Sequence, residues 1–332
     1  MKQHSKKIIG YLKTLIFPAV MWAAFAIVAL ITNQDYFFST YITSNIFRTS
    51  VLSCSIGMAI AIPLSGGRWD FAPGTIATLG GIIGINLGMS IQLNVFGILG
   101  LCIILCVILA LIEAAVYLTL RVPNMIVSLG IVMVYEALTG IVYGGNGANV
   151  FNASPEYMNN LLMLSRSPWC YILLAVIMVM VYILLYKTRF GSNIKSLGSN
   201  ARLAINAGVN EKKNIVQTYV LVGVLLGVAA LLNANISQVT AASNLSSTTL
   251  MFSSMGPVLI GLFLAGYSCL PWGIFIGSLG MNVMTYGLVS FGIDGAIVTI
   301  ITGVIIVLIM AYTTNQNKII EFFQKPKSKE TI

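Results

Sequence analysis

The chain has 332 residues, of which 58% are hydrophobic and 8% charged, and its mean hydropathy of +0.92 is too high for a soluble globular protein. A membrane-crossing helix takes about 20 apolar residues, so this composition supplies about nine or ten crossings and leaves no tract of more than about 30 residues, which excludes a fused soluble catalytic domain. The net charge of +9 reports on the sidedness of the loops and is no sign of nucleic-acid binding.

A walk along the chain finds apolar runs bounded by polar or turn residues, as expected of an all-α, polytopic membrane protein. The third run is the weakest, because it is rich in glycine and follows the polar stretch 66–70, which suggests a broken or re-entrant start. The predicted spans are Thr14–Ile31, Asn45–Leu64, Pro73–Ser90, Val95–Leu118, Met125–Tyr143, Trp169–Tyr186, Asn214–Ile236, Leu250–Tyr267, Trp272–Ser290 and Ala296–Tyr312. Together they form a single transmembrane domain over residues 1–332.

The basic residues fix the orientation of these spans. With ten spans, 16 of the 18 Lys and Arg fall on one side, and only Arg48 and Arg166 fall on the other. By the positive-inside rule the basic side is cytoplasmic, so both termini are cytoplasmic.

Two connections are long enough to hold structure of their own. The external segment 144–167 contains Gly-Gly-Asn-Gly and Ser-Pro-Glu turn signals and predicts a short surface helix. The cytoplasmic segment 187–213 contains a helix-compatible stretch, 200–207, with Ser199 and Asn200 as candidate N-caps and Gly208 as a natural stop.

The sequence contains no set of residues typical of an enzyme active site. The nine acidic residues are dispersed, no acidic pair lies at helical spacing within a span, and no phosphate-binding loop of the G-x-x-x-x-G-K-[ST] type is present. We therefore expect no catalytic residue, no metal site and no cofactor on this chain. Transport is the default function of such a protein.

Acidic side chains within or beside the spans are candidates for a translocation path or gate. Glu113 lies about 12 Å along the fourth span, and Glu136 about 18 Å along the fifth span, from the cytoplasmic loop that joins these two spans. Asp70 precedes the third span. Each such group costs about 2.5 to 3.5 kcal/mol to insert. Two interpretations stay open, a neutralised or paired structural group and a polar group that faces a water-filled path. Asp294 is better explained as an N-terminal helix cap.

Glycines and neutral polar groups give two further signals. Small-xxx-small spacing predicts close helix packing at Gly80, Gly84, Gly88, Gly223 and Gly227. A polar cluster begins near the end of the seventh span with Asn233 and Asn235 and continues with Ser237, Gln238, Thr240, Ser243 and Asn244. Two interpretations of this polar cluster stay open: the residues belong to an ordinary external loop, or they contact the substrate. Their neutral groups suit a neutral polyhydroxyl ligand better than an ion.

Four segments together resemble one family. They are Ser65–Gly74 (SGGRWDFAPG), Arg121–Gly130 (RVPNMIVSLG) with the later Gly144-Gly145, Thr188–Gly191 (TRFG), and Gly198-Ser199-Asn200 followed by Ala207-Gly208-Val209. Their order and spacing resemble the permease subunits of bacterial ABC importers of the ribose, galactose and autoinducer-2 class. The sequence departs from the family at residues 201–204, where Ala-Arg-Leu-Ala replaces Pro-Glu-Ala-Ala. It also departs at Glu113 and Glu136, and at the glycine-poor stretch 261–267.

The resemblance implies a small polar solute, such as ribose or a related monosaccharide, imported across the bacterial cytoplasmic (inner) membrane by alternating access. It implies a separate ATPase subunit that holds ATP and Mg²⁺, a second permease subunit in a homodimer or heterodimer, and an extracellular solute-binding protein. Related folds carry an inverted repeat of spans 2–5 and 7–10, which this topology permits. The residues expected to couple the loop 187–213 to the ATPase are Gly198, Ser199, Asn200, Ala201, Arg202, Leu203, Ala204 and Gly208. The alternative is an ion-coupled secondary transporter with Glu113 or Glu136 as the coupling group.

Overall fold

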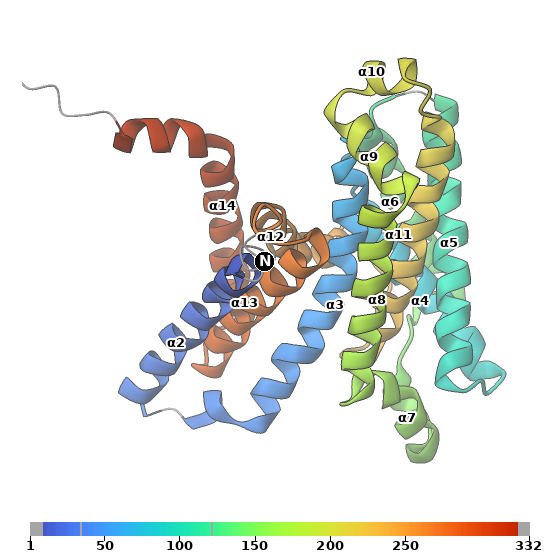
Figure 1. The fold of residues 1–332 in the computed structure, drawn as a ribbon. Coiled ribbons are helices and arrows are strands. Elements are labelled where there is room, and N and C mark those ends of the chain that lie inside the picture. Colours follow the sequence, from blue (N-terminus) through green and yellow to red (C-terminus); the bar gives the residue numbers. More distant parts are fainter. Residues whose placement is uncertain (1–8, 34, 121, 325–332) are drawn as a thin grey trace, which may run out of the picture.

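The computed structural model describes residues 9–33, 35–120 and 122–324, a range that leaves out Arg121 and both chain ends. Within it the regular structure is helical, with one isolated β-bridge between Ala148 and Val239 (Figure 1). The long helices are α2 (Ile16–Ile31), α3 (Thr40–Ser65), α4 (Pro73–Ser90), α5 (Val95–Leu120), α6 (Asn124–Ile141), α8 (Trp169–Lys187), α11 (Glu211–Ala234), α12 (Thr248–Leu264), α13 (Leu270–Ser290) and α14 (Gly295–Gln324). Shorter helices are α7 (Pro155–Leu161), α9 (Arg189–Ser199) and α10 (Ala201–Asn206), with 3₁₀ turns at Asp35–Phe38, Val142–Gly145, Val150–Asn152 and Leu162–Ser165.

The all-α membrane fold is confirmed, with differences at individual helices. The third run is one unbroken helix, α4, and shows no break at its start. Helix α3 begins five residues before the predicted span, because the Ser39 hydroxyl caps it by accepting a hydrogen bond from the Ile42 N–H (3.3 Å). Seven helices of the described chain are long and apolar enough to cross a membrane. Helices α12 and α14 have shorter apolar stretches, and α4 is not among the seven, so the total of ten crossings stays a prediction.

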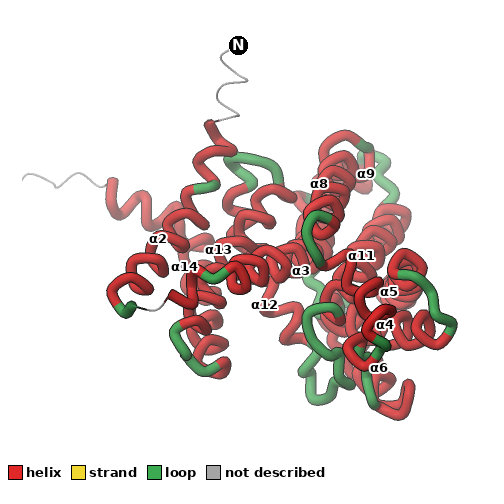
Figure 2. The backbone as a smooth tube through the Cα atoms, turned by 90° about the horizontal axis from the view of Figure 1, so that it is seen from below, coloured by secondary structure: helices red, strands yellow, loops and turns green. Residues whose placement is uncertain are grey.

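Helix α3 stands at the centre of the bundle. It packs against α12 and α13 on one side, where α2 and α14 also lie, and against α11 and α8 on the other, where α4, α5 and α6 lie (Figures 1 and 2). The apolar window of α3 is 83% buried, and that of the peripheral α2 is only 22% buried. Helix α3 is therefore enclosed by protein on nearly all sides, whereas most of α2 is exposed at the edge of the bundle.

The predicted glycines lie at close helix contacts. On α4, Gly84 faces Cys102 of α5, and a Cβ on Gly84 would lie only 3.1 Å from the Cys102 Cα. On α11, a Cβ on Gly223 would lie 2.5 Å from the Cα of Val107, on another face of α5. Gly80 and Gly88 continue the first contact and Gly227 the second. Helix α5 is thus held between α4 and α11 by backbone approaches that leave no room for a side chain.

The two long connections lie at opposite ends of the bundle. Helices α9 and α10 of the cytoplasmic segment are at the top of Figure 1, and α7 of the external segment is at the bottom. Helix α14 begins at the external end, and there the Asp294 carboxylate accepts a hydrogen bond from the Ala296 N–H (2.8 Å), as a helix cap does.

Candidate functional site

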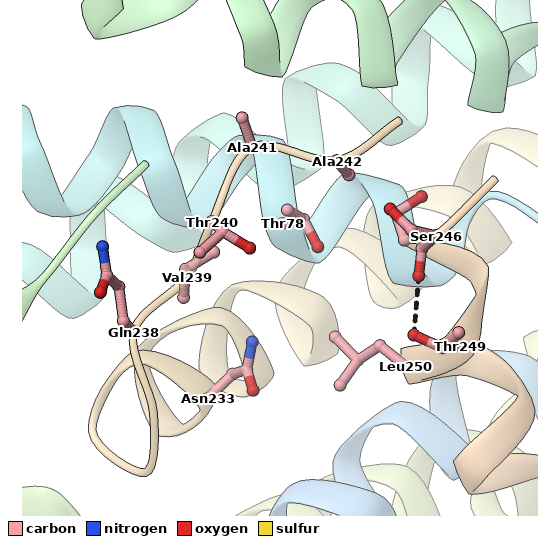
Figure 3. Close-up of a pocket in the computed structure, with 11 residues that line it drawn as sticks. Thr78, Asn233, Gln238, Val239, Thr240, Ala241, Ala242, Ser246, Thr249 and Leu250 are labelled. Atoms are coloured by element: carbon pink, nitrogen blue, oxygen red, sulfur yellow. Dashed lines mark hydrogen bonds between the residues drawn. The ribbon is translucent and has the colours of Figure 1, made fainter. Parts of the chain in front are cut away.

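A cavity of about 290 Å³ lies between the first half of α4, the end of α11 and the start of α12 (Figure 3). Most of its walls are hydroxyl and amide groups, which both donate and accept hydrogen bonds, and none of its lining residues carries a charge. The lining residues are Thr78, Asn233, Gln238, Val239, Thr240, Ala241, Ala242, Ser246, Ser247, Thr249 and Leu250. Such a site suits a small neutral molecule that carries several hydroxyl groups.

Most of this lining belongs to the segment 235–247, which connects α11 to α12 and is called the outer loop below. Its first half is held by the β-bridge, in which Ala148 and Val239 exchange N–H···O bonds of 2.8 and 3.0 Å. The middle is held by Thr139 of α6, whose hydroxyl accepts a hydrogen bond from the Ala242 N–H (2.8 Å) and donates its own to the Glu136 main-chain carbonyl (2.7 Å). The outer loop is therefore anchored to α6 and to the segment that follows α6.

Glu136 of α6 anchors the end of the outer loop. Its side chain is only 4% exposed. One carboxylate oxygen, Oε2, accepts a hydrogen bond from the Leu245 N–H (2.8 Å), and the other, Oε1, accepts two from the N–H (2.8 Å) and hydroxyl (2.6 Å) of Ser247. Three donors thus satisfy a buried carboxylate. They also hold Leu245 at a φ of 62°, a conformation that non-glycine residues rarely adopt.

The Ser247 hydroxyl extends this network to the wall formed by α4. Its Oγ lies 2.5 Å from the Thr75 hydroxyl, and both residues are buried. Thr78, one turn further along α4, lines the cavity and is 7% exposed. Helices α4 and α6 therefore meet the outer loop at the same residue.

The two asparagines predicted near a path have different surroundings. Asn233 lines the cavity. Asn235 does not line it. The Asn235 side chain is 1% exposed and donates a hydrogen bond to the Leu161 carbonyl (3.1 Å), and the main-chain carbonyl of Asn235 accepts one from the Arg48 guanidinium (3.1 Å). Asn235 thus connects the end of α11 to α7 and α3.

The other two acidic residues predicted near a path, Glu113 and Asp70, do not line the cavity. Glu113 of α5 is fully buried, and neither of its carboxylate oxygens has a hydrogen-bond partner among the described residues. Asp70, in the connection between α3 and α4, accepts a hydrogen bond from the Ala72 N–H (2.9 Å). Burial raises the pKa of Asp70 above its ordinary value.

The cytoplasmic segment 187–213 presents a small helix to solvent. The Asn200 side chain caps α10 by accepting a hydrogen bond from the Leu203 N–H (3.1 Å), and Gly208 follows the helix with a φ of 90°, as predicted. Arg202 and Leu203 are exposed, and Ala204 is buried. Just before the cap, Gly198 packs against the backbone at the end of α3.

Several cavity residues were missed by reasoning from the sequence alone. Thr78, Ser246, Ser247 and Thr249 all line the site, but they were not selected. The run Ser246-Ser247-Thr248-Thr249 at the start of α12 was a usable signal, because four successive hydroxyl residues are unusual at the start of a membrane helix. Thr78 carried no signal, since it lies among small residues of a packing helix.

Comparison with known proteins gives the family. A family model described as the permease component of the branched-chain amino acid transport system matches residues 41–310. The chain belongs to this family of ABC transporter permeases. It is 25% identical to the galactose/methyl galactoside import permease protein MglC of Haemophilus influenzae, over 88% of this chain and 92% of that one. It is 24% identical to the autoinducer 2 import system permease protein LsrC of Photorhabdus luminescens, over 80% of this chain and 78% of that one.

A solved structure supports the same fold. An ABC transporter assigned to the metal-chelate type, in an inward-facing conformation, matches with a TM-score of 0.51 and 15% identity, over 92% of this chain and 99% of that one. At that identity the likeness concerns the fold alone. The family match and the relatives identify this chain as a multi-span permease of an ABC importer in the bacterial inner membrane. A permease is the transport subunit of such an importer and not its catalytic subunit.

Proposed function

We propose that this permease imports a neutral, polyhydroxylated solute of about monosaccharide size. The observation that carries the proposal is the external cavity, whose polar lining consists of hydroxyl and amide groups without a charged side chain. Its volume of about 290 Å³ is close to the lower end of ligand pockets, which start at about 300 Å³. The named substrates of the relatives, galactosides and autoinducer 2, support a small polar solute.

The proposal includes an ATPase subunit that binds ATP and Mg²⁺ and docks on α9 and α10. The exposed side chains Arg202 and Leu203 give this surface a charged and an apolar contact. A second permease subunit completes the pathway, and an extracellular binding protein delivers the solute to the external end. ATP-driven alternating access then moves the solute past the cavity.

Ion-coupled transport has weaker support. The Glu136 carboxylate is occupied by three hydrogen-bond donors, so it is not free to bind a coupling ion in this conformation. Glu113 is fully buried and does not line the cavity. An ABC permease family match also favours ATP as the energy source.

The cavity is tested by uptake into cells that lack the native permease and carry either wild type or a variant. Asn233→Leu and Thr240→Val remove polar groups from the lining, and Asn152→Leu is the matched control on an exposed external turn. We expect the two cavity variants to raise the KM for the solute about tenfold, since each leaves a solute hydroxyl unpaired. An unchanged KM in both variants, at normal expression, would contradict the proposal.

A further inference from the structure

Helix α6 is held at both ends by side-chain hydrogen bonds to other elements of the bundle. At its first residue, the Asn124 side chain donates a hydrogen bond to the Trp69 carbonyl (2.7 Å) and accepts one from the Tyr219 hydroxyl (2.9 Å). Asn124 is only 5% exposed. This clamp connects α6 to the α3–α4 connection and to α11.

The α3–α4 connection in turn rests on the cytoplasmic segment. Gly198, at the end of α9, lies so close to the end of α3 that a Cβ there would collide with the Ser65 carbonyl oxygen and lie 3.3 Å from the Gly66 carbonyl carbon. A displacement of α9 therefore displaces residues 65–67, and with them Trp69, the partner of Asn124.

The opposite end of α6 carries the anchors of the outer loop. Glu136 and Thr139 hold Leu245, Ser247 and Ala242. Twelve residues separate Asn124 from Glu136, a distance of about 18 Å along a helix. A single rigid element thus contacts both the α3–α4 connection and the lining of the external cavity.

The middle of α6 packs on its neighbours with one face, where Val132 is fully buried, and leaves its opposite face free of contacts. Met133 and Val134 are 67% and 56% exposed, and a Cβ added at Gly130 would meet nothing within 4 Å. Small sliding of a packed helix over its neighbours is a common element of conformational change.

We propose that α6 is a lever that transmits movement of the cytoplasmic segment to the outer loop, with Asn124 and Glu136 as the positioning residues at its two ends. The inference rests on the proposed function, because it requires an ATPase that moves α9 and α10. In this arrangement the outer loop is a gate over the cavity, and Glu136 is its latch.

The two clamps have opposite expected effects when they are removed. Glu136→Gln places an amide NH₂ opposite a main-chain N–H, so at least one of the three bonds is lost and the gate opens in every nucleotide state. Asn124→Ala leaves the latch intact but disconnects α6 from Trp69, so the gate stays closed in every nucleotide state. A merely structural role of either residue would not produce this opposition.

The test measures how fast a thiol in the cavity reacts with a membrane-impermeant maleimide added outside. The thiol is introduced as Thr78→Cys, a buried position in the cavity wall. The native cysteines give little background, since Cys54, Cys102, Cys106 and Cys170 are buried and Cys269 is at the cytoplasmic end. Proteoliposomes contain this chain with its ATPase and binding protein, and labelling is compared with and without ATP and vanadate.

We expect the labelling rate of Thr78→Cys to change about tenfold between the two nucleotide states. In the double variant Thr78→Cys/Glu136→Gln, we expect fast labelling both with and without ATP and vanadate. In Thr78→Cys/Asn124→Ala, we expect slow labelling under both conditions. Met133→Leu, a lipid-facing change on the same helix, should switch as the parent does. Ser247→Ala removes one latch bond from the loop side and serves as a second route to fast labelling.

Two results would overturn the lever. One is a normal nucleotide response with Asn124→Ala. The other is slow labelling of both Glu136→Gln and Ser247→Ala. Failure of the proposed function is distinguishable, because wild type would then take up no neutral solute with ATP, whatever the labelling rates of the Thr78→Cys proteins.

Discussion

The Glu136 carboxylate accepts hydrogen bonds from both the main-chain N–H and the hydroxyl of Ser247, 111 residues away in the chain. A carboxylate at this depth is costly unless donors surround it, and here the Leu245 N–H supplies a third. The contact joins α6 to the loop between α11 and α12 beside the external cavity. The buried charge is thus part of the construction of the site, although it does not line it.

Helix packing around α5 predicts that alanine substitutions at Gly223 and at Gly100 have very different effects on stability. Gly223→Ala places a Cβ 2.5 Å from the Val107 Cα, so α11 must move away from α5. We expect a loss of about 1–3 kcal/mol of stability, as overpacking produces. Gly100→Ala, on α5 itself, is the matched control, because its Cβ would meet nothing within 4 Å. The midpoint of thermal unfolding in detergent measures both, and equal midpoints would contradict the packing.

The cap of α10 predicts an effect on assembly. Asn200→Ala removes the acceptor for the Leu203 N–H and should destabilise the short helix by about 1 kcal/mol. We expect less ATPase to co-purify with this variant. Asn200→Ser keeps a capping oxygen and should restore the wild-type yield of complex. If Asn200→Ala and Asn200→Ser behave alike, the cap has no part in docking.

Asp70 predicts a dependence of stability on pH. Burial raises its pKa in the folded protein above the ordinary 3.8, so the folded state binds this proton more tightly than the unfolded state does. The stabilisation is present at low pH and is lost as the pH rises from about 4 through the raised pKa. Thermal midpoints of wild type should therefore fall more steeply with pH than those of Asp70→Asn. The exposed Glu156→Gln should keep the wild-type slope, and identical slopes in all three would refute the prediction.

The uncharged lining of the cavity predicts discrimination by charge. A hexose and the corresponding uronic acid have similar size, but the carboxylate of the acid would enter a site without a cationic partner. We expect the neutral sugar alone to compete for uptake, with little change when salt is raised, because no ion pair is screened. Equal competition by the acid would show that the solute binds elsewhere.

The sequence predicted those features that depend on local patterns. The bounds of α4 agree with the predicted span, Asn200 and Gly208 delimit α10, and the glycines lie at close helix contacts. These follow from periodicity, capping and small-residue spacing, which act over a few residues. A substrate contact by the polar cluster after α11 stays a prediction: Asn233 lines the cavity, and Asn235 faces α7.

Tertiary partners were beyond prediction. Glu136 was equally consistent with a path and a structural role, because its three donors come from a loop distant in sequence. Asn124 gave no signal at all, since its partners Trp69 and Tyr219 are brought to it only by the packing of α11 and of the α3–α4 connection. Periodicity reports which face of a helix is buried, and it carries no information on which helix covers that face.

The most direct test of the proposed transport function is uptake into proteoliposomes that contain this chain with its ATPase and binding protein. The uncoupler is a mixture of a protonophore and a Na⁺ ionophore, which together abolish the H⁺ and Na⁺ gradients, and ATP is supplied at the cytoplasmic face. The account predicts that a neutral monosaccharide accumulates only when ATP is present and that the uncoupler has no effect. Uptake that persists without ATP and collapses with the uncoupler would contradict it.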